Sequence, residues 1–197
     1  MLVPLEKPNF DVRFENEYQA NAKKYLPYWE DFYNVCNQIK PVYNTWYRIV
    51  DRQFDFYGNT TYIQGGWDWE SFVVMPKAID FGIKNGSEVI KILRTVAKTG
   101  NPAPSSLEQY YKAPRTGFGA VTSSFHISGR VLKKIATAPK SVEDQWMAIT
   151  HISPSDVRQF KQLSGKFANY CDKALEIVKV IQPGSDNYKL WFGTFEN

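Results

Sequence analysis

The residues best suited to nucleophilic or acid–base chemistry are two histidines, His126 and His151, and two cysteines, Cys36 and Cys171. Neither cysteine lies near a histidine in the sequence, and the chain has no serine elbow and no phosphate-binding glycine loop. We expect His126 to meet phosphate or solvent and His151 to cap a helix end. The cysteines match no metal or redox spacing, so we expect two buried free thiols rather than a disulfide. These residues argue against an enzyme.

Asp51 and Asp55 are spaced to lie on one face of a helix, and two further acids follow by residue 70. Paired acids of this kind can hold a divalent metal, as in a nuclease. Arg48 and Arg52 alternate with the pair, however, and ion pairs along a helix surface explain that pattern better. We therefore predict no metal and no cofactor.

Positive charge is concentrated in residues 83–140, which carry ten Lys or Arg and only two Asp or Glu. The formal net charge of the whole chain is +4, so the rest of the chain is net acidic. A local excess of cations indicates a surface for an acidic partner, which the net charge alone does not.

Two expected helices in this stretch each place their basic residues on one face. At about 100° per residue, the cations of a first helix, capped by Ser87, fall opposite its apolar residues. A second run at 120–138 has the same pattern. The linker between them holds Gly117 and Gly119, whose backbone N–H groups can come close to a phosphate. The candidate nucleic-acid-binding residues are Lys84, Lys91, Arg94 and Lys98 on the first helix, Lys112 and Arg115 in the linker, and Ser123, His126, Arg130, Lys133, Lys134 and Thr137 on the second.

Cations flanked by Ser and Thr contact phosphate oxygens and fix position without reading sequence. About six to ten such contacts give strong, salt-sensitive and sequence-independent binding. A solvated charged face on each helix is the alternative interpretation, and a membrane surface is another acidic partner. The basic faces lack the Trp and Phe flanks of helices that insert into membranes. We therefore predict a protein that coats nucleic acid.

The hydrophobic spacing predicts an all-α fold, a helical bundle with an extended N-terminal arm and a short aromatic C-terminal tail. We expect the arm at 1–14, the helical domain at 15–187 and the tail at 188–197. Pro27 and Pro41 should divide the first helical region into three, and Pro76 should kink or break the segment 67–81. Short helices are expected at 105–111 and from Ser141, with a flexible link at 113–119 between them. Ser153 should cap a long last helix that stops before residue 183. A small hairpin at 58–66 is an open alternative.

The aromatic share is 16%, which is high and indicates either an aromatic core or interfaces between proteins. No run approaches the length of a membrane-spanning helix, and the first residues lack the pattern of a signal peptide.

In its size, its proline-containing arm, its Tyr- and Trp-rich helices and its basic amphipathic helices, the chain resembles the major coat proteins of filamentous archaeal double-stranded DNA viruses of the lipothrixvirus and rudivirus kind. The resemblance implies a helical bundle that wraps linear double-stranded DNA in A-form, paired with itself or with a paralogous coat protein. It also implies a location in the virion, and in the host cytoplasm during assembly. Residues 1–14 and 188–197 would then be subunit contacts. The acids among residues 6–31 depart from this pattern and argue against the arm as the main DNA contact.

Two other classes of function stay open. A monomeric viral or plasmid regulator would read bases with Arg, Asn or Gln at the start of one recognition helix. The helix after Ser87 opens with Glu88 instead. A metal-dependent hydrolase would use Asp51 and Asp55. The leading prediction is a self-assembling structural capsid protein or nucleoprotein.

Overall fold

The computed structural model describes residues 17–53, 69–100, 114–150 and 152–182, and nearly all of them are helical. Within these ranges there is no strand, which confirms the predicted all-α class. The predicted arm, tail, 58–66 hairpin and 105–111 helix lie outside the described residues. The elements are α2 (Glu17–Gln53), the π-helix η1 (Glu70–Val74), α4 (Met75–Thr99), α6 (Pro114–Ala136), α7 (Lys140–Thr150) and α8 (Pro154–Ile181).

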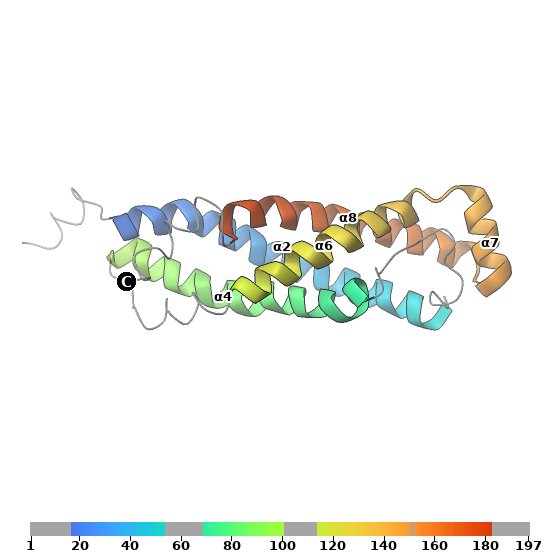
Figure 1. Cartoon of the computed structure of the whole chain (residues 1–197), viewed down its shortest axis with the longest axis horizontal. Coiled ribbons are helices and arrows are strands. Elements are labelled where there is room, and N and C mark those ends of the chain that lie inside the picture. The colour runs from blue at the N-terminus through green and yellow to red at the C-terminus, as the bar shows by residue number, and fades with distance from the viewer. Residues whose placement is uncertain (1–16, 54–68, 101–113, 151, 183–197) are drawn as a thin grey trace, which may run out of the picture.

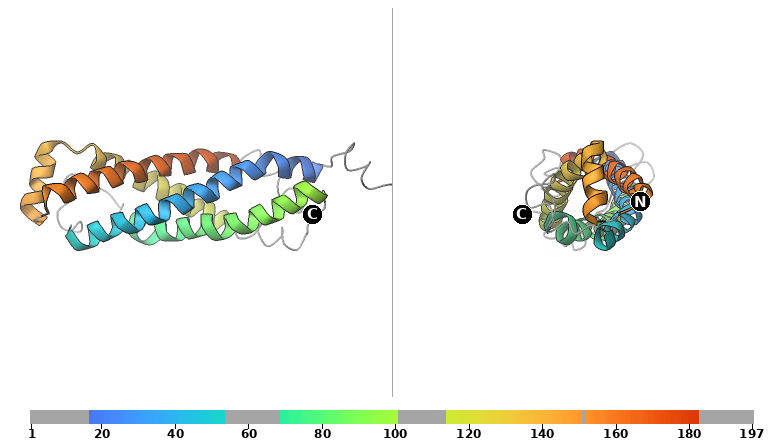
Figure 2. Two further views of the ribbon diagram at one scale, coloured as in Figure 1. Left: turned by 180° about the vertical axis from the view of Figure 1, so that it is seen from behind. Right: turned by 90° about the vertical axis from the view of Figure 1, so that its right-hand side faces the viewer.

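The four long helices α2, α4, α6 and α8 lie side by side and alternate in direction (Figure 1). α2 packs against α4 and α8, and α6 packs against α8 and α4, so the contacts close into a four-helix bundle. α7 crosses one end of the bundle, as the end-on view in Figure 2 shows. α4 and α8 therefore occupy opposite corners, and each leaves an outer face to solvent.

α8 begins and ends as the sequence predicts. Ser153 has extended backbone, and its hydroxyl accepts a hydrogen bond from the Asp156 N–H at 3.1 Å. Pro154 occupies the first turn, where its missing N–H costs nothing because that group has no partner inside the helix. Asp156 in the first turn and Lys179 in the last turn both complement the helix dipole.

The predicted breaks in the first helical region are wrong. α2 runs without interruption from Glu17 to Gln53, with Pro27 and Pro41 inside it. Both prolines are exposed, while the opposite face of the helix buries Tyr25, Trp29 and further large side chains. Tertiary packing of the buried face keeps α2 helical across both prolines, although each proline would end an isolated helix.

The predicted start of the basic helix at Ser87 is also wrong. α4 begins at Met75, with Pro76 in its first turn, and continues through Ser87 to Thr99. Pro76 thus lies in the first turn of α4, directly after the π-helix η1, which runs into α4 without a non-helical residue between them. The C-terminal end is as predicted: Gly100 has a positive φ of 70° and its N–H donates to the Val96 carbonyl at 2.7 Å.

The segment 113–119 is not a flexible link from Pro114 onward, because α6 begins at that residue. α7 begins one residue before the predicted cap, at Lys140, and the Val142 and Glu143 N–H groups donate to the Pro139 carbonyl. Ser141 therefore lies inside α7. Lys161 ties this short helix to α8, since its ammonium donates to the Glu143 carboxylate and to the Ala138 carbonyl.

Most aromatic residues of the described ranges lie in the core. Trp46 stacks with Phe160 from α8, and its indole N–H donates to the buried Ser164 hydroxyl at 3.1 Å. Trp29 and Phe118 bring α2 and α6 into contact with ring centroids 5.7 Å apart. Within the described residues, the exposed large hydrophobic side chains are Tyr28, Tyr47 and Trp69. Within the described ranges, aromatic side chains therefore contribute mainly to the core.

Candidate nucleic-acid interface

The outer face of α4 carries the predicted cations Lys84, Lys91, Arg94 and Lys98, all of them exposed. Lys77 belongs with them, because it is exposed and α4 begins before it. The four lysines at 77, 84, 91 and 98 recur every seventh residue, which spaces them about 10 Å apart along the helix. A repeat of seven drifts by only about 20° per step, so they form one track. We call these four lysines and Arg94 the α4 track.

Lys77 was not among the residues predicted from the sequence. It lies outside the basic segment 83–140, and a helix that began at Ser87 would have excluded it. The seven-residue spacing was visible in the sequence and would have found Lys77 if Pro76 had been recognised as a first-turn proline.

Acidic neighbours compensate the α4 track only in part. Arg94 pairs with Glu30 of α2 at 3.6 Å, and Lys91 pairs with Glu88 at 3.8 Å. All four side chains are well exposed, and ion pairs of that kind contribute about 0–1 kcal/mol. Within the described ranges, Lys77, Lys84 and Lys98 have no acidic partner. The track can therefore exchange its present contacts for phosphate at little cost.

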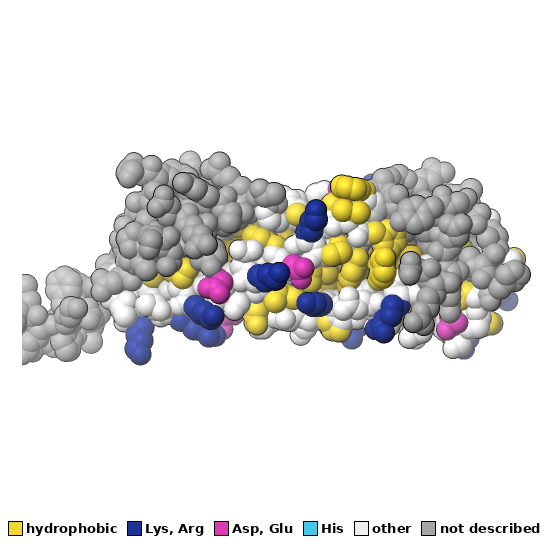
Figure 3. Space-filling model, turned by 90° about the horizontal axis from the view of Figure 1, so that it is seen from below, with side chains coloured by type: hydrophobic (Ala, Val, Ile, Leu, Met, Phe, Trp, Pro, Cys, Tyr) yellow, Lys and Arg dark blue, Asp and Glu magenta, His cyan; other side chains and the backbone are white. Residues whose placement is uncertain are grey.

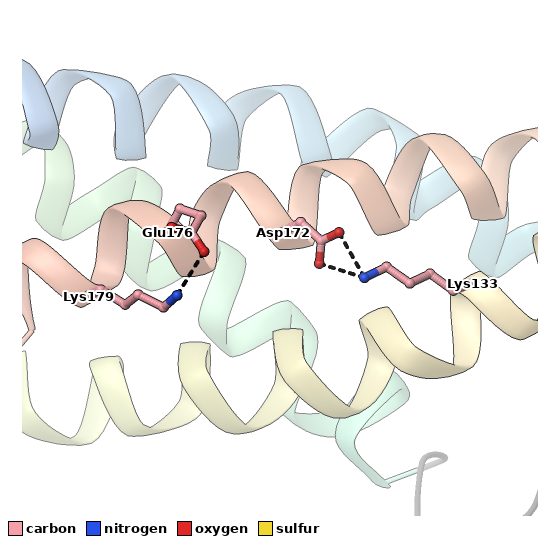
Figure 4. A network of polar contacts seen from close by, with 4 residues as sticks. All are labelled: Lys133, Asp172, Glu176 and Lys179. Carbon is pink, nitrogen blue, oxygen red and sulfur yellow. Dashed lines mark hydrogen bonds and ion pairs between the residues drawn. The ribbon is translucent and has the colours of Figure 1, made fainter.

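The residues predicted to form the basic face of α6 differ in whether their polar groups already have partners. Arg130 and Lys134 are exposed, and Ser123 is half-buried beside them. The Thr137 hydroxyl donates to the Lys133 carbonyl at 2.8 Å, so it is already used within the helix. The ammonium of Lys133 contacts both carboxylate oxygens of Asp172 on α8, at 2.9 and 2.8 Å (Figure 4). Arg130 and Lys134 are the cations of α6 best placed for a phosphate.

His126 is exposed and lies on the side of α6 that faces α8, at a groove of mixed charge. It lines a groove of about 610 Å³ between α6 and α8, together with Asp172, Glu176, Thr122 and the apolar side chains of Leu175 and Val178. Glu176 pairs with Lys179 at 2.8 Å, as Figure 4 shows. Because Asp172 pairs with Lys133 and Glu176 pairs with Lys179, which also lines the groove, the local charge is nearly balanced and His126 stays a predicted phosphate contact.

The cations of α4 and α6 face out from neighbouring helices but lie toward opposite ends of the bundle. The rings of Phe81 and Phe118, with centroids 5.1 Å apart, fix the register of this antiparallel pair. From that contact, Arg94 lies about 20 Å in one direction and Arg130 about 18 Å in the other, at 1.5 Å per residue. In Figure 3 the Lys and Arg side chains are accordingly spread along the length of the face. The arrangement is an extended track rather than a compact basic patch.

The glycines of the predicted linker do not offer backbone to a phosphate. Gly117 lies in α6, where a Cβ would come within 2.1 Å of the Phe81 ring, so this glycine allows helix packing. Gly119 also lies within α6, where backbone N–H groups donate to carbonyls four residues earlier. Arg115 belongs to α6, but its side chain is outside the described residues, as is Lys112.

The chain matches no protein-family model, no curated protein and no solved structure.

The remaining candidates for chemistry are inert or outside the described ranges. Cys36 and Cys171 are free and buried, as predicted. Burial raises the pKa of the Cys36 thiol to about 12 and also raises the pKa of Cys171. The part of the chain that the structure describes contains no group of three or more His, Cys, Asp or Glu that could hold a metal ion. Asp55, His151 and the side chain of Asp51 are not described.

Among the described residues, no helix is both long enough and apolar enough to cross a membrane.

Proposed function

We propose that this protein coats nucleic acid, linear double-stranded DNA in the first instance, as a subunit of a self-assembling nucleoprotein. The observation that supports this is the α4 track, whose cations are spaced along one rigid helix. It spans about 32 Å, which corresponds to about nine base pairs of duplex at 3.4 Å per step. Arg130 and Lys134 extend the contact along the neighbouring helix.

The form of the track favours coating over base recognition. Lysine is a flexible point charge that follows phosphates without demanding one geometry, whereas base reading uses Arg, Asn or Gln at groove depth. A straight row of cations also matches a rod-shaped polyanion better than it matches a small anionic ligand. The all-α bundle agrees with the resemblance to coat proteins of filamentous archaeal viruses, and a location in the virion follows from that resemblance as part of the proposal.

DNA binding measured against salt tests the proposal. Fluorescence anisotropy with a labelled duplex of random sequence should show tight binding at about 50 mM salt and a steep loss as salt rises. The variant Lys77→Glu/Lys84→Glu/Lys98→Glu should weaken binding more than tenfold. The slope of log K against log salt should fall by about three, since each lost phosphate contact removes about 0.9.

The matched control is Lys140→Glu/Arg158→Glu/Lys166→Glu, which makes the same change in net charge on α7 and α8. These side chains are exposed and α8 lies at the corner opposite α4. The control should lose much less affinity. An equal loss of DNA affinity in both variants would show that only net charge matters. Absence of DNA binding by the unaltered chain at about 50 mM salt would reject the proposal. Arg130→Glu/Lys134→Glu tests whether α6 shares in the contact.

A further inference from the structure

Trp69 is the most exposed large hydrophobic side chain of the described residues, with 61% of its surface accessible. Tyr28 and Tyr47 follow at 38% each. Tryptophan supplies more contact area than any other residue type, and its exposure on a rigid element is characteristic of interfaces. The same sequence buries Trp29 and Trp46 almost completely, so the exposure of Trp69 is specific to its position.

The backbone beside Trp69 is held rigidly by side chains of two other helices. It directly precedes η1, whose π-helical geometry leaves carbonyl groups to be satisfied from outside. The Ser124 hydroxyl of α6 donates to the Glu70 carbonyl at 2.9 Å, and the Tyr43 hydroxyl of α2 donates to the Ser71 carbonyl at 3.1 Å. A rigid element loses little conformational entropy when a partner binds. Such π-turns recur at functional sites.

Tyr47 of α2 extends the exposed aromatic surface. Its ring packs edge-on against Phe72 of η1, with centroids 5.6 Å apart, and Phe72 is itself only partly buried. We call Tyr47, Trp69, Glu70 and Phe72 the η1 patch. It lies at the junction of α2 and η1, where Glu70 stands seven residues before Lys77, the first lysine of the α4 track, while Lys98 lies at the other end of α4.

The η1 patch contains a carboxylate that lacks compensation. Glu70 Oε2 is buried and has no hydrogen-bond partner, although part of the residue remains accessible. A buried carboxylate oxygen without a partner costs free energy, and an incoming cation would remove that cost. The indole face of a neighbouring Trp is also the best aromatic surface for a cation. The patch is thus complementary to a Lys or Arg side chain.

The Glu70 carboxylate makes the patch a poor surface for nucleic acid, because phosphates would be repelled. Among the described residues, Lys140, Arg158 and Lys166 of α7 and α8 are exposed cations without an acidic partner that lie outside the proposed DNA-binding surface. We infer that the η1 patch docks a second copy of this chain, which inserts a Lys or Arg side chain against Trp69 and Glu70. This inference builds on the proposed function and names the surface through which copies would associate.

The two surfaces in this contact are different, because the patch is acidic and aromatic and the inserted side chain is basic. A contact between unlike surfaces is heterologous, and unless it closes into a ring it continues as an open filament. The η1 patch therefore accounts for growth along an axis rather than for a closed dimer.

Sedimentation velocity over a series of protein concentrations, without DNA, tests the inference. The unaltered chain should self-associate, and association should weaken as salt rises. Trp69→Ala should raise the dissociation constant at least tenfold, about the effect of removing an interface anchor. Glu70→Gln should weaken association less and should abolish most of its salt dependence. Tyr28→Ala is the matched control, since Tyr28 equals Tyr47 in exposure but lies far along α2.

Thermal melting should show that Trp69→Ala folds as stably as the unaltered chain, since the side chain is exposed. A monomeric unaltered chain, or self-association unaffected by Trp69→Ala, would overturn the inference. So would loss of DNA binding in Trp69→Ala with association intact, because that result would assign Trp69 to nucleic acid. DNA anisotropy on the same samples separates the two proposals. If the unaltered chain self-associates through Trp69 but does not bind DNA, only the proposed coating function is rejected.

Discussion

Gly82 and Cys36 set how closely α2 and α4 can approach. A Cβ at position 82 would lie 2.1 Å from the Cys36 Sγ and 2.9 Å from its Cβ. Both separations are shorter than any real contact of this kind, so the helices could not keep their present spacing. On the other hairpin, Gly129 faces Cys171, but there the nearest atom would be 3.4 Å away. The Gly82–Cys36 contact is therefore much tighter than the Gly129–Cys171 contact.

Gly82→Ala should destabilise the fold by about 1–3 kcal/mol, the usual cost of overpacking a core. Adding Cys36→Ala should recover much of that loss, because it removes the Sγ atom that the new methyl group meets. Urea unfolding of the two single variants and the double variant measures the coupling.

Gly119→Ala is the control for helix propensity, since nothing lies within 4 Å of a Cβ there. It should stabilise the chain by about 0.5–1 kcal/mol. If Gly82→Ala behaved like Gly119→Ala, the close contact between α2 and α4 would be wrong.

At the scale of elements, α2 shows how packing overrides local preference. Proline inside a helix removes one hydrogen bond and clashes with the carbonyl four residues earlier, at a cost of about 3 kcal/mol. Pro27 and Pro41 both face solvent, and no packing of their own compensates for that cost. The buried face of the helix, with Tyr25, Trp29 and Phe32 fully enclosed, supplies the stability instead.

Pro27→Ala should therefore stabilise the protein, by up to about 3 kcal/mol, because it restores a helical hydrogen bond and loses no buried contact. The shift in the urea unfolding midpoint measures this. Pro154→Ala is the matched control, since a first-turn proline is already well placed and its replacement should change little. A loss of stability in Pro27→Ala would show that a bend at this proline is part of the packing.

At the scale of the whole molecule, the core encloses one thiol from each half of the chain. Cys36 belongs to the α2–α4 hairpin and Cys171 to the α6–α8 hairpin, and burial raises the pKa of both. The thiolate is thus disfavoured in the folded protein, whereas the thiol of an unfolded chain loses its proton near its ordinary pKa of 9.0. The contribution of Cys36 to stability is complete below about pH 9 and is lost as the pH rises toward about 12.

Stability should therefore fall steeply above pH 9, and Cys36→Ala/Cys171→Ala should make that fall shallower. Urea unfolding at neutral pH and at steps above pH 9 measures the two slopes. The double variant will be less stable at neutral pH because it opens cavities, but the pH dependence is independent of that loss. Val178→Ala, which opens a cavity without a titrating group, should lower stability equally at every pH. Equal slopes in all three proteins would contradict the argument.

The sequence by itself determined the helical class, the bounds of α8 and the cations of the outer faces. These depend on local patterns: a Ser-Pro start, a proline after the last turn, and polar residues on one side of each helix. Lys84, Lys98 and Arg130 could be placed on exposed faces because a charged side chain without a partner stays in water.

Tertiary structure alone decided how those faces relate and where the helices continue. α2 passes through two prolines and α4 extends back to Met75, because burial of one face outweighs local signals. The antiparallel order of α4 and α6 carries Arg94 and Arg130 toward opposite ends of the bundle, and the approach of α8 places His126 at a groove of mixed charge. Likewise, the orphaned oxygen of Glu70 and the exposure of Trp69 depend on neighbours distant in the sequence, which a local pattern cannot encode.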